Sequence, residues 1–227
     1  MTSDEGQMPM PTPGSGLSAR TRFGRKPERG SHDRADFDAV VDAARVGHLA
    51  YVVDGQPYVL PMGYGRDGDS IVFHGSTGAR PFRLLAEGAP CCFTVTHLDG
   101  LVLARSAFNS SMNYRSAVLL GRCEPVEDEA EKWRTLDVIT EHLLPGRLAS
   151  LRPMTRKEVA ATMVLRLPIV EYSVKSRIGD PGDDPEDVDF PVWAGVMPMH
   201  MAFGAPIPAP DLAPGVTEPS YLAQWNA

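Results

Sequence analysis

The sequence predicts a mainly β domain of the α+β class, in which antiparallel strands form a β-barrel with peripheral helices. Two observations lead to this fold class. Short apolar runs are separated by Asp-Gly and other glycine-containing turns through most of the chain, and helical periodicity is limited to a few short stretches. We expect the domain to cover residues 31–205, between a flexible arm at 1–30 and a proline-rich tail at 206–227.

The helices are predicted from apolar periodicity and from residues that begin or end helices. Asp33 can cap the start of the first one, and Gly88 can end the second. The expected helices cover 33–46, 80–87, 128–144 and a short stretch from Thr155. Each is short, which fits helices that decorate a barrel.

The strands are predicted from apolar runs that end in turn signals. Asp54-Gly55 and Asp99-Gly100 are both expected to be tight turns that join two antiparallel strands. The expected strands cover 48–53, 57–64, 70–74, 90–97, 100–105, 115–126, 162–175 and 193–203.

Composition argues against several classes of protein. A net charge of −7 disfavours a general nucleic-acid-binding surface. The chain has no apolar stretch of membrane-spanning length and no signal-peptide core, so we expect a cytoplasmic protein without a membrane partner. The three cysteines lack zinc spacing, which fits a reducing compartment. Common hydrolase and metal motifs are absent from the sequence, and no metal site is expected.

The segment 73–85 has the pattern of an anion site. An apolar strand runs into small polar and glycine residues, and then into Arg80-Pro81 at the start of a helix. Glycine lets backbone N–H groups approach an anion, while Ser76, Thr77 and Arg80 add side-chain donors. A helix start also favours negative charge. An ordinary capped turn between strand and helix explains the same pattern, so both interpretations stay open.

A second polar segment, 109–116, contains a tyrosine and an arginine and leads directly into an apolar strand. Polar groups at the start of a strand can be presented to a ligand in a fixed geometry. The alternative is a loop with a surface arginine.

Five segments in this order carry a resemblance to a known family. They are 59–62, 73–80, 99–106, 112–116 and 192–196. Together they resemble the pyridoxamine 5′-phosphate oxidase-related flavoproteins, and within them the nitroimidazole-resistance branch. The resemblance implies a split β-barrel that forms a homodimer and binds FMN at the subunit interface.

The resemblance also implies which residues bind FMN. Backbone groups of the strand around 58–63 would bond the edge of the flavin ring, and Ser76, Thr77 and Arg80 would hold the phosphate. Arg115 and Ser116 would reach FMN across the dimer interface. The full set is Val59, Leu60, Pro61, Met62, Phe73, His74, Ser76, Thr77, Arg80, Arg115 and Ser116.

Some positions depart from the pattern of the true oxidases. Gly63 stands where they have a substrate-binding lysine, Ala79 where they have a basic residue, and Ser116 where they have glutamine. These differences argue against vitamin B6 oxidation. Arg147 remains a candidate anchor for an anionic substrate, and Trp193 is expected to pack in the core.

The leading hypothesis from the sequence is an FMN-dependent oxidoreductase that acts on a small molecule. The flavin would supply the redox chemistry, and His74 could orient a substrate or share a proton. A structural role for His74 is equally compatible. The alternatives are a non-catalytic flavin- or haem-binding protein and a deazaflavin-dependent reductase of the same fold. The sequence offers no clear pair of haem ligands, which disfavours the haem branch.

Overall fold

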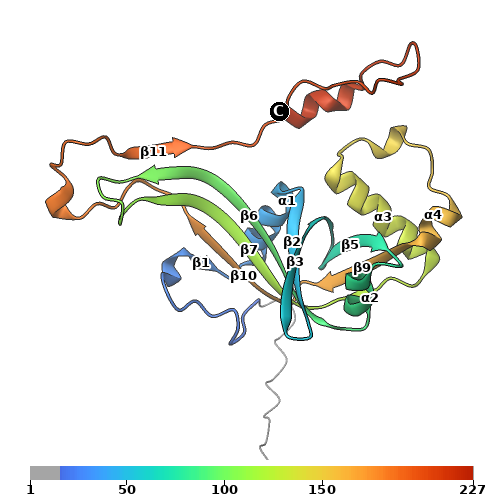
Figure 1. Cartoon of the computed structure of the whole chain (residues 1–227), viewed down its shortest axis with the longest axis horizontal. Coiled ribbons are helices and arrows are strands. Elements are labelled where there is room, and N and C mark those ends of the chain that lie inside the picture. The colour runs from blue at the N-terminus through green and yellow to red at the C-terminus, as the bar shows by residue number, and fades with distance from the viewer. Residues whose placement is uncertain (1–15, 227) are drawn as a thin grey trace, which may run out of the picture.

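The computed structural model describes residues 16–226, which form two antiparallel sheets surrounded by short helices (Figure 1). The larger sheet has the strand order β1-β10-β7-β6-β2-β3, and β11 pairs with the far part of β6. The smaller sheet has the order β4-β5-β9-β8. The mainly β, split-barrel fold class predicted from the sequence is confirmed.

The strands are β1 (Gly30–Ser31), β2 (Val46–Val53), β3 (Gln56–Gly63), β4 (Gly65–Asp67), β5 (Ser70–Ser76), β6 (Pro90–Leu103), β7 (Ser111–Arg122), β8 (Glu124–Pro125), β9 (Thr162–Pro168), β10 (Glu171–Arg177) and β11 (Gly195–Pro198). The helices are α1 (Arg34–Ala43), α2 (Arg80–Ala86), α3 (Glu129–Leu143) and α4 (Arg156–Ala161), with 3₁₀ turns at Pro27–Arg29, Leu148–Ser150, Pro185–Asp187 and Ser220–Asn226.

All four predicted helices are present, and side chains cap three of them, including Asp33 as the sequence indicated. Asp33 accepts a hydrogen bond from Ala35 N at the start of α1, and Asp128 accepts one from Glu131 N at the start of α3. Thr155 and Glu158 form a reciprocal capping box on α4. The predicted turn between β2 and β3 is also confirmed, because Asp54 and Gly55 both have positive φ angles.

Asp99-Gly100 does not form the predicted turn. The two strands expected at 90–97 and 100–105 are one continuous strand, β6, with a bulge between Leu98 and Gly100. The glycine has another purpose here, since a Cβ at Gly100 would lie 3.0 Å from the carbonyl oxygen of Met197 on β11. Gly100 therefore permits the close approach of a third strand.

Two other strand predictions also need correction. The strand expected at 162–175 is two strands, β9 and β10, which belong to different sheets. The break follows Pro168, where Val170 N bonds back to the Pro168 carbonyl. The last strand, β11, covers four residues instead of the expected 193–203.

The core lies between the sheets and α1, and aromatic rings fill its centre. The Phe93 ring contacts those of Tyr64 and Phe73, with centroids 5.0 and 5.4 Å apart. Gly47 makes room for Phe93, because a Cβ there would lie 2.2 Å from its ring. The buried Tyr64 hydroxyl donates to the Val41 carbonyl, which ties the core to α1.

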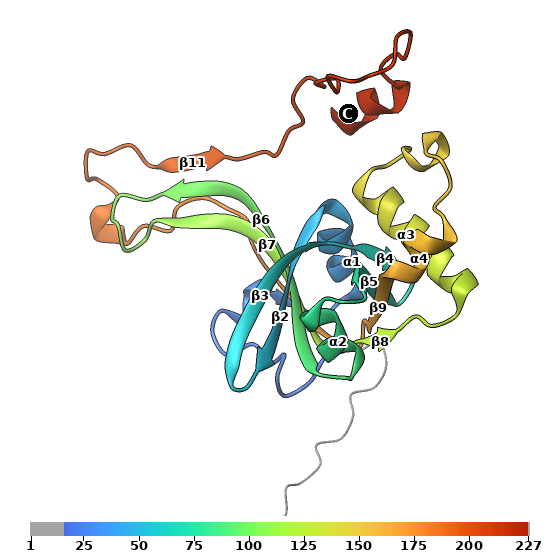
Figure 2. The same cartoon turned by 45° about the vertical axis from the view of Figure 1, so that its right-hand side comes forward.

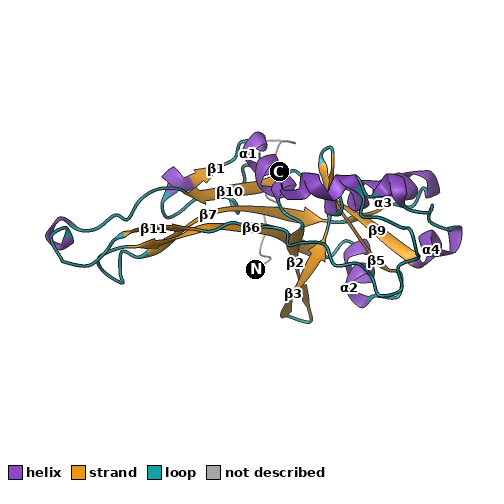
Figure 3. Cartoon of the chain, turned by 90° about the horizontal axis from the view of Figure 1, so that it is seen from above, coloured by secondary structure: helices purple, strands orange, loops and turns teal. Residues whose placement is uncertain are grey.

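The distal halves of β6 and β7, together with β11, form an arm that extends beyond the rest of the molecule (Figure 3). Five apolar side chains share one face of it and are exposed. We call this the arm face: Leu98, Leu101, Leu103, Met112 and Met197. Trp193, expected in the core, is 63% exposed beside this arm, so that prediction is wrong.

Part of the expected N-terminal arm packs against β10, whereas residues 1–15 lie outside the described chain. Gly16 accepts a hydrogen bond from Tyr172 N, and Thr21 is buried. Glu171 is also buried and receives hydrogen bonds from Arg20 and Ser18. The expected C-terminal tail docks as well, since the Trp225 indole donates to the Pro145 carbonyl at 3.0 Å.

The Arg20–Glu171 pair gives a pH-dependent prediction. Hydrogen bonds from Arg20 hold the pKa of Glu171 below its usual range. The pair therefore stabilises the fold above the ordinary glutamate pKa, and its contribution is lost as the pH falls through the lowered folded-state pKa. Arg20→Ala should reduce the free energy of unfolding by about 1 kcal/mol at pH 7, a value discounted for the exposed arginine. In urea titrations the difference should shrink at acid pH. An undiminished difference there would contradict this account.

Candidate flavin site

The predicted anion loop lies at the end of β5, directly before α2. Gly75 allows the helix to approach, since a Cβ there would lie 2.4 Å from the Phe82 ring of α2. Ser76, Thr77 and Arg80 are all exposed on this loop. The structure therefore brings the three predicted phosphate-binding residues together on one surface.

The donors of the loop differ in how free they are to bind an anion. Thr77 uses both its N–H and its hydroxyl to bond the Ala161 carbonyl, at 3.1 and 3.3 Å. The Ser76 hydroxyl oxygen accepts from Gly78 N, which leaves its own proton free to donate. Helix α2 begins without a side-chain cap. Ser76 and Arg80 are consequently the side chains best placed to meet a phosphate.

Arg80 faces the turn of the β2–β3 hairpin, which lies beside α2 (Figure 2). Its guanidinium is 3.8 Å from the carboxylate of Asp54, and both side chains are largely exposed. Such an exposed pair contributes little to stability. Arg80 can therefore turn from Asp54 to an anionic ligand at small cost.

Strand β3 is the edge of the larger sheet, so one side of its backbone has no partner strand among residues 16–226. Pro57 and Pro61 lie on it, and proline is tolerated in edge strands where its missing N–H would face away from the sheet. Val59 has the same orientation as these prolines, which leaves its N–H and C=O available to a ligand. Val59 and Pro61 are exposed, whereas Leu60 and Met62 pack against the core.

Phe73 and His74 follow each other on β5 and face opposite sides of the smaller sheet. The Phe73 side chain is fully buried against Phe93, so it has no surface to offer a ligand. His74 pairs with Val164 on β9, and desolvation lowers its pKa. The imidazole is consequently neutral at pH 7, with one donor and one acceptor nitrogen.

The remaining predicted residues lie apart from this loop and have partners within the chain. Arg115 makes a bidentate ion pair with Asp99, at 2.9 and 2.8 Å. The Ser116 hydroxyl donates to the Lys175 carbonyl at 3.3 Å. Arg147, the candidate substrate anchor, donates to the Tyr221 hydroxyl at 2.9 Å. One chain therefore assembles the β3 edge and the anion loop, without Arg115 and Ser116.

The six histidines fall into two groups that the sequence did not distinguish. His32, His97 and His142 each place Nε2 within hydrogen-bond distance of a backbone carbonyl oxygen. His48, His74 and His200 make no such bond within the described chain, and all three are exposed. Residues 16–226 contain no group of three His, Cys, Asp or Glu side chains that could hold a metal ion by themselves. They also contain no helix long and apolar enough to cross a membrane.

The antiparallel split barrel, with the open edge of β3 beside the predicted anion loop, indicates the class to which the chain belongs. The family model for pyridoxamine 5′-phosphate oxidase matches residues 33–176. The chain is a member of this family, as the resemblance had indicated.

Two solved structures share a large part of the sequence. One is the FAD and haem binding protein from Mycobacterium smegmatis, with 44% identity and a TM-score of 0.84, over 87% of this chain and 97% of that chain. Another is the flavocytochrome Anf3 from Azotobacter vinelandii, with 40% identity and a TM-score of 0.87, over 92% and 97% of the two chains.

A 5-nitroimidazole antibiotic resistance protein from Bacteroides thetaiotaomicron shares the fold at 23% identity and a TM-score of 0.55, over 64% of this chain and 85% of that chain. No curated protein sequence matches the chain.

Proposed function

We propose that the protein is a redox protein that binds a flavin along β3 and the anion loop, and that also binds haem. The observation that carries the proposal is the 44% identity, over almost the whole of both chains, to a protein that binds FAD and haem. The similarity to a flavocytochrome supports it independently. This proposal takes up the flavin- or haem-binding alternative considered from the sequence.

The residues of the loop fit a flavin phosphate. Ser76 has a free hydroxyl proton, Arg80 has only a distant carboxylate partner, and both are exposed. The sequence predicted FMN, but FAD carries a phosphate at the same position of the ribityl chain. We favour FAD because the similar M. smegmatis protein binds it.

Haem also fits the available donors. Histidine and methionine are common axial ligands of haem iron. His48 and His200 are exposed without a hydrogen-bond partner within the described residues, and Met201 is 91% exposed. The sequence showed no pair of haem ligands, but candidate ligands need not be neighbours in the chain. His48 is far from His200 and Met201 in the sequence.

A bound flavin supplies hydride and single-electron chemistry, whereas the protein positions it and shields it from water. The free backbone groups of Val59 would orient the ring, and Ser76 and Arg80 would anchor the phosphate. The neutral His74 imidazole can hold or accept a proton on the other face of β5. The small-molecule substrate would meet the flavin from the open side of β3.

We further propose a homodimer. The five exposed apolar side chains of the arm face lie on neighbouring strands, and contiguous apolar surface of this kind marks interaction sites. Arg115 and Ser116 lie on β7 near this face, so a second copy could bring them to the flavin.

Purification followed by an absorption spectrum and extraction of the bound groups tests the proposal. We expect flavin bands together with a Soret band, and chromatography of the extract should identify FAD. Recovery of FMN would revise the cofactor and keep the site. A protein that binds neither flavin nor haem when titrated with each would contradict the proposed function.

A further inference from the structure

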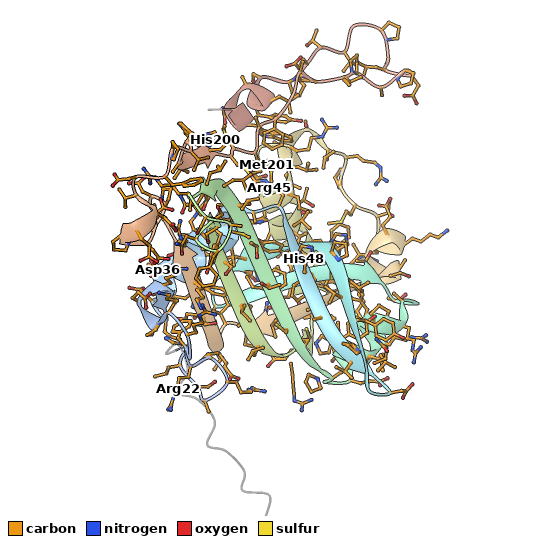
Figure 4. The ribbon with its side chains drawn as sticks, turned by 60° about the vertical axis from the view of Figure 1, so that its left-hand side comes forward. Arg22, Asp36, Arg45, His48, His200 and Met201 are labelled. Atoms are coloured by element: carbon orange, nitrogen blue, oxygen red, sulfur yellow. The ribbon has the colours of Figure 1, made fainter. Side chains whose placement is uncertain are left out.

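We infer that His48 is an axial ligand of the haem, which lies against the outer face of β2 and β3. This inference rests on the proposed function. His48 comes from the middle of β2, where alternate residues point to opposite faces of the sheet. Gly47, Leu49 and Tyr51 face the core, so His48 projects from the outer face (Figure 4).

The surroundings of His48 suit a flat apolar macrocycle. Its cross-strand neighbours are Pro61 on β3 and Thr94 on β6. On the same face, Val46 is 51% exposed and Val59 is 59% exposed, and Ala50 is the cross-strand partner of Val59. A ligand that covered these side chains would remove apolar surface from water around a single imidazole. No protein group within the described chain competes for the ring nitrogens of His48.

A cation lies at the start of the strand that carries His48. Arg45 immediately precedes β2, and its Nε is buried without a hydrogen-bond partner in the described chain. It forms no ion pair there either, although most other arginines of the barrel do. Haem carries two propionate groups that need positive charge or hydrogen-bond donors. Arg45 lies three residues before His48, at the start of β2, and would offer positive charge to a propionate (Figure 4).

The other two open histidines fit this role less well. His74 lies on the smaller sheet, on the side of β5 where Val164 packs with the α3 and α4 residues. His200 follows β11 and lies near Asp99, whose carboxylate is already bonded to Arg115. Only His48 stands in the centre of an exposed apolar sheet surface.

His48 also lies next to the strand that is proposed to hold the flavin. It is paired with Pro61, on the strand proposed to hold the flavin, and neighbouring strands lie about 5 Å apart. A haem on the outer face and a flavin along the free edge of β3 would therefore be close neighbours, as electron transfer between them requires.

The test compares haem binding by the wild type, His48→Ala and His200→Ala, with the full chain of each titrated with haemin. Absorption is recorded after removal of free haemin, and flavin content reports whether each variant is folded. We expect His48→Ala to lose the wild-type Soret spectrum and keep its flavin. Added imidazole should restore the wild-type Soret spectrum, because it can replace the missing ring. His200→Ala should retain its haem.

The outcomes separate this inference from the proposed function. Wild-type protein that binds no haem would overturn the proposed function itself. Wild-type protein that binds haem, with an unchanged spectrum and stoichiometry in His48→Ala, would overturn only the assignment of His48. Loss of haem in His200→Ala, with normal haem in His48→Ala, would do the same.

Discussion

Arg80→Ala is expected to weaken flavin binding by about 1.5–3 kcal/mol, or roughly ten- to a hundredfold in the dissociation constant. Arg80 is the one cationic side chain within residues 73–80, because Ala79 occupies the neighbouring position. The N–H and the hydroxyl of Thr77 both donate to the Ala161 carbonyl, so Thr77 cannot replace the phosphate contact of Arg80. The loss should appear in fluorescence titrations of the apoprotein with FAD and with FMN.

Arg83→Ala is the matched control for this variant. Arg83 is exposed on the same helix, three residues further on, and makes no ion pair within the described chain. Its replacement removes the same charge and should leave flavin affinity nearly unchanged. If both variants bind flavin equally weakly, the loss reflects only the removal of one positive charge from this region. If Arg80→Ala binds flavin as tightly as the wild type, the phosphate site is refuted.

A second comparison uses the turn that faces Arg80. Asp54 lies 3.8 Å from the guanidinium and would compete with a phosphate for it. Asp54→Asn removes this competition and should tighten flavin binding slightly, by a fraction of a kcal/mol for an exposed pair. Weaker binding in this variant would indicate that Asp54 positions Arg80 instead.

The strand, loop and helix of the segment 73–85 could be predicted from the sequence because their determinants are local. Strand β5, the glycine-containing loop and the start of α2 follow one another within 20 residues, and each has its own signal. The helices were predictable for the same reason, since caps such as Asp33 and Thr155 act on residues within one turn.

The errors arose where distant segments decide the structure. Asp99-Gly100 has the signal of a hairpin turn, yet pairing with β11 keeps β6 extended through it. The segment 162–175 has the pattern of one strand, although the chain passes from the smaller sheet to the larger sheet after Pro168. Trp193 has apolar neighbours in sequence but is 63% exposed beside the arm. Local sequence patterns do not predict which distant strands pair with each other.

The proposed haem ligand, His48, could not be predicted from the sequence for a related reason. A scattered histidine has no sequence signal, and His48 differs from His32, His97 and His142 only in what the fold places beside its ring. The alternation of Gly47, His48 and Leu49 shows that His48 faces away from a buried neighbour on each side. That local signal could have identified an outward-facing histidine, but not its apolar surroundings on β3.

Leu101→Glu is expected to dissociate the proposed homodimer. Leu101 lies in the middle of the arm face, paired with Met112 on one side and Met197 on the other. Leu101 is 46% exposed in one chain, so an interface can bury about half of its surface, and burial of that half contributes roughly 1 kcal/mol. A two-fold interface contains each residue twice, so the variant loses roughly 2 kcal/mol, which corresponds to about thirtyfold in the dimer dissociation constant. Sedimentation velocity over a range of concentrations measures this change.

Leu151→Glu provides the control, because it introduces the same charge at an equally exposed leucine. Leu101 is 46% exposed and Leu151 is 41% exposed, but Leu151 follows the 3₁₀ turn at Leu148–Ser150, away from the arm. If a second copy completes the flavin site with Arg115 and Ser116, the monomer formed by Leu101→Glu should also lose flavin affinity, whereas Leu151→Glu should remain a dimer with normal flavin. A monomeric Leu101→Glu protein that keeps full flavin affinity would separate dimerisation from cofactor binding, because β3 and the anion loop of one chain would then suffice.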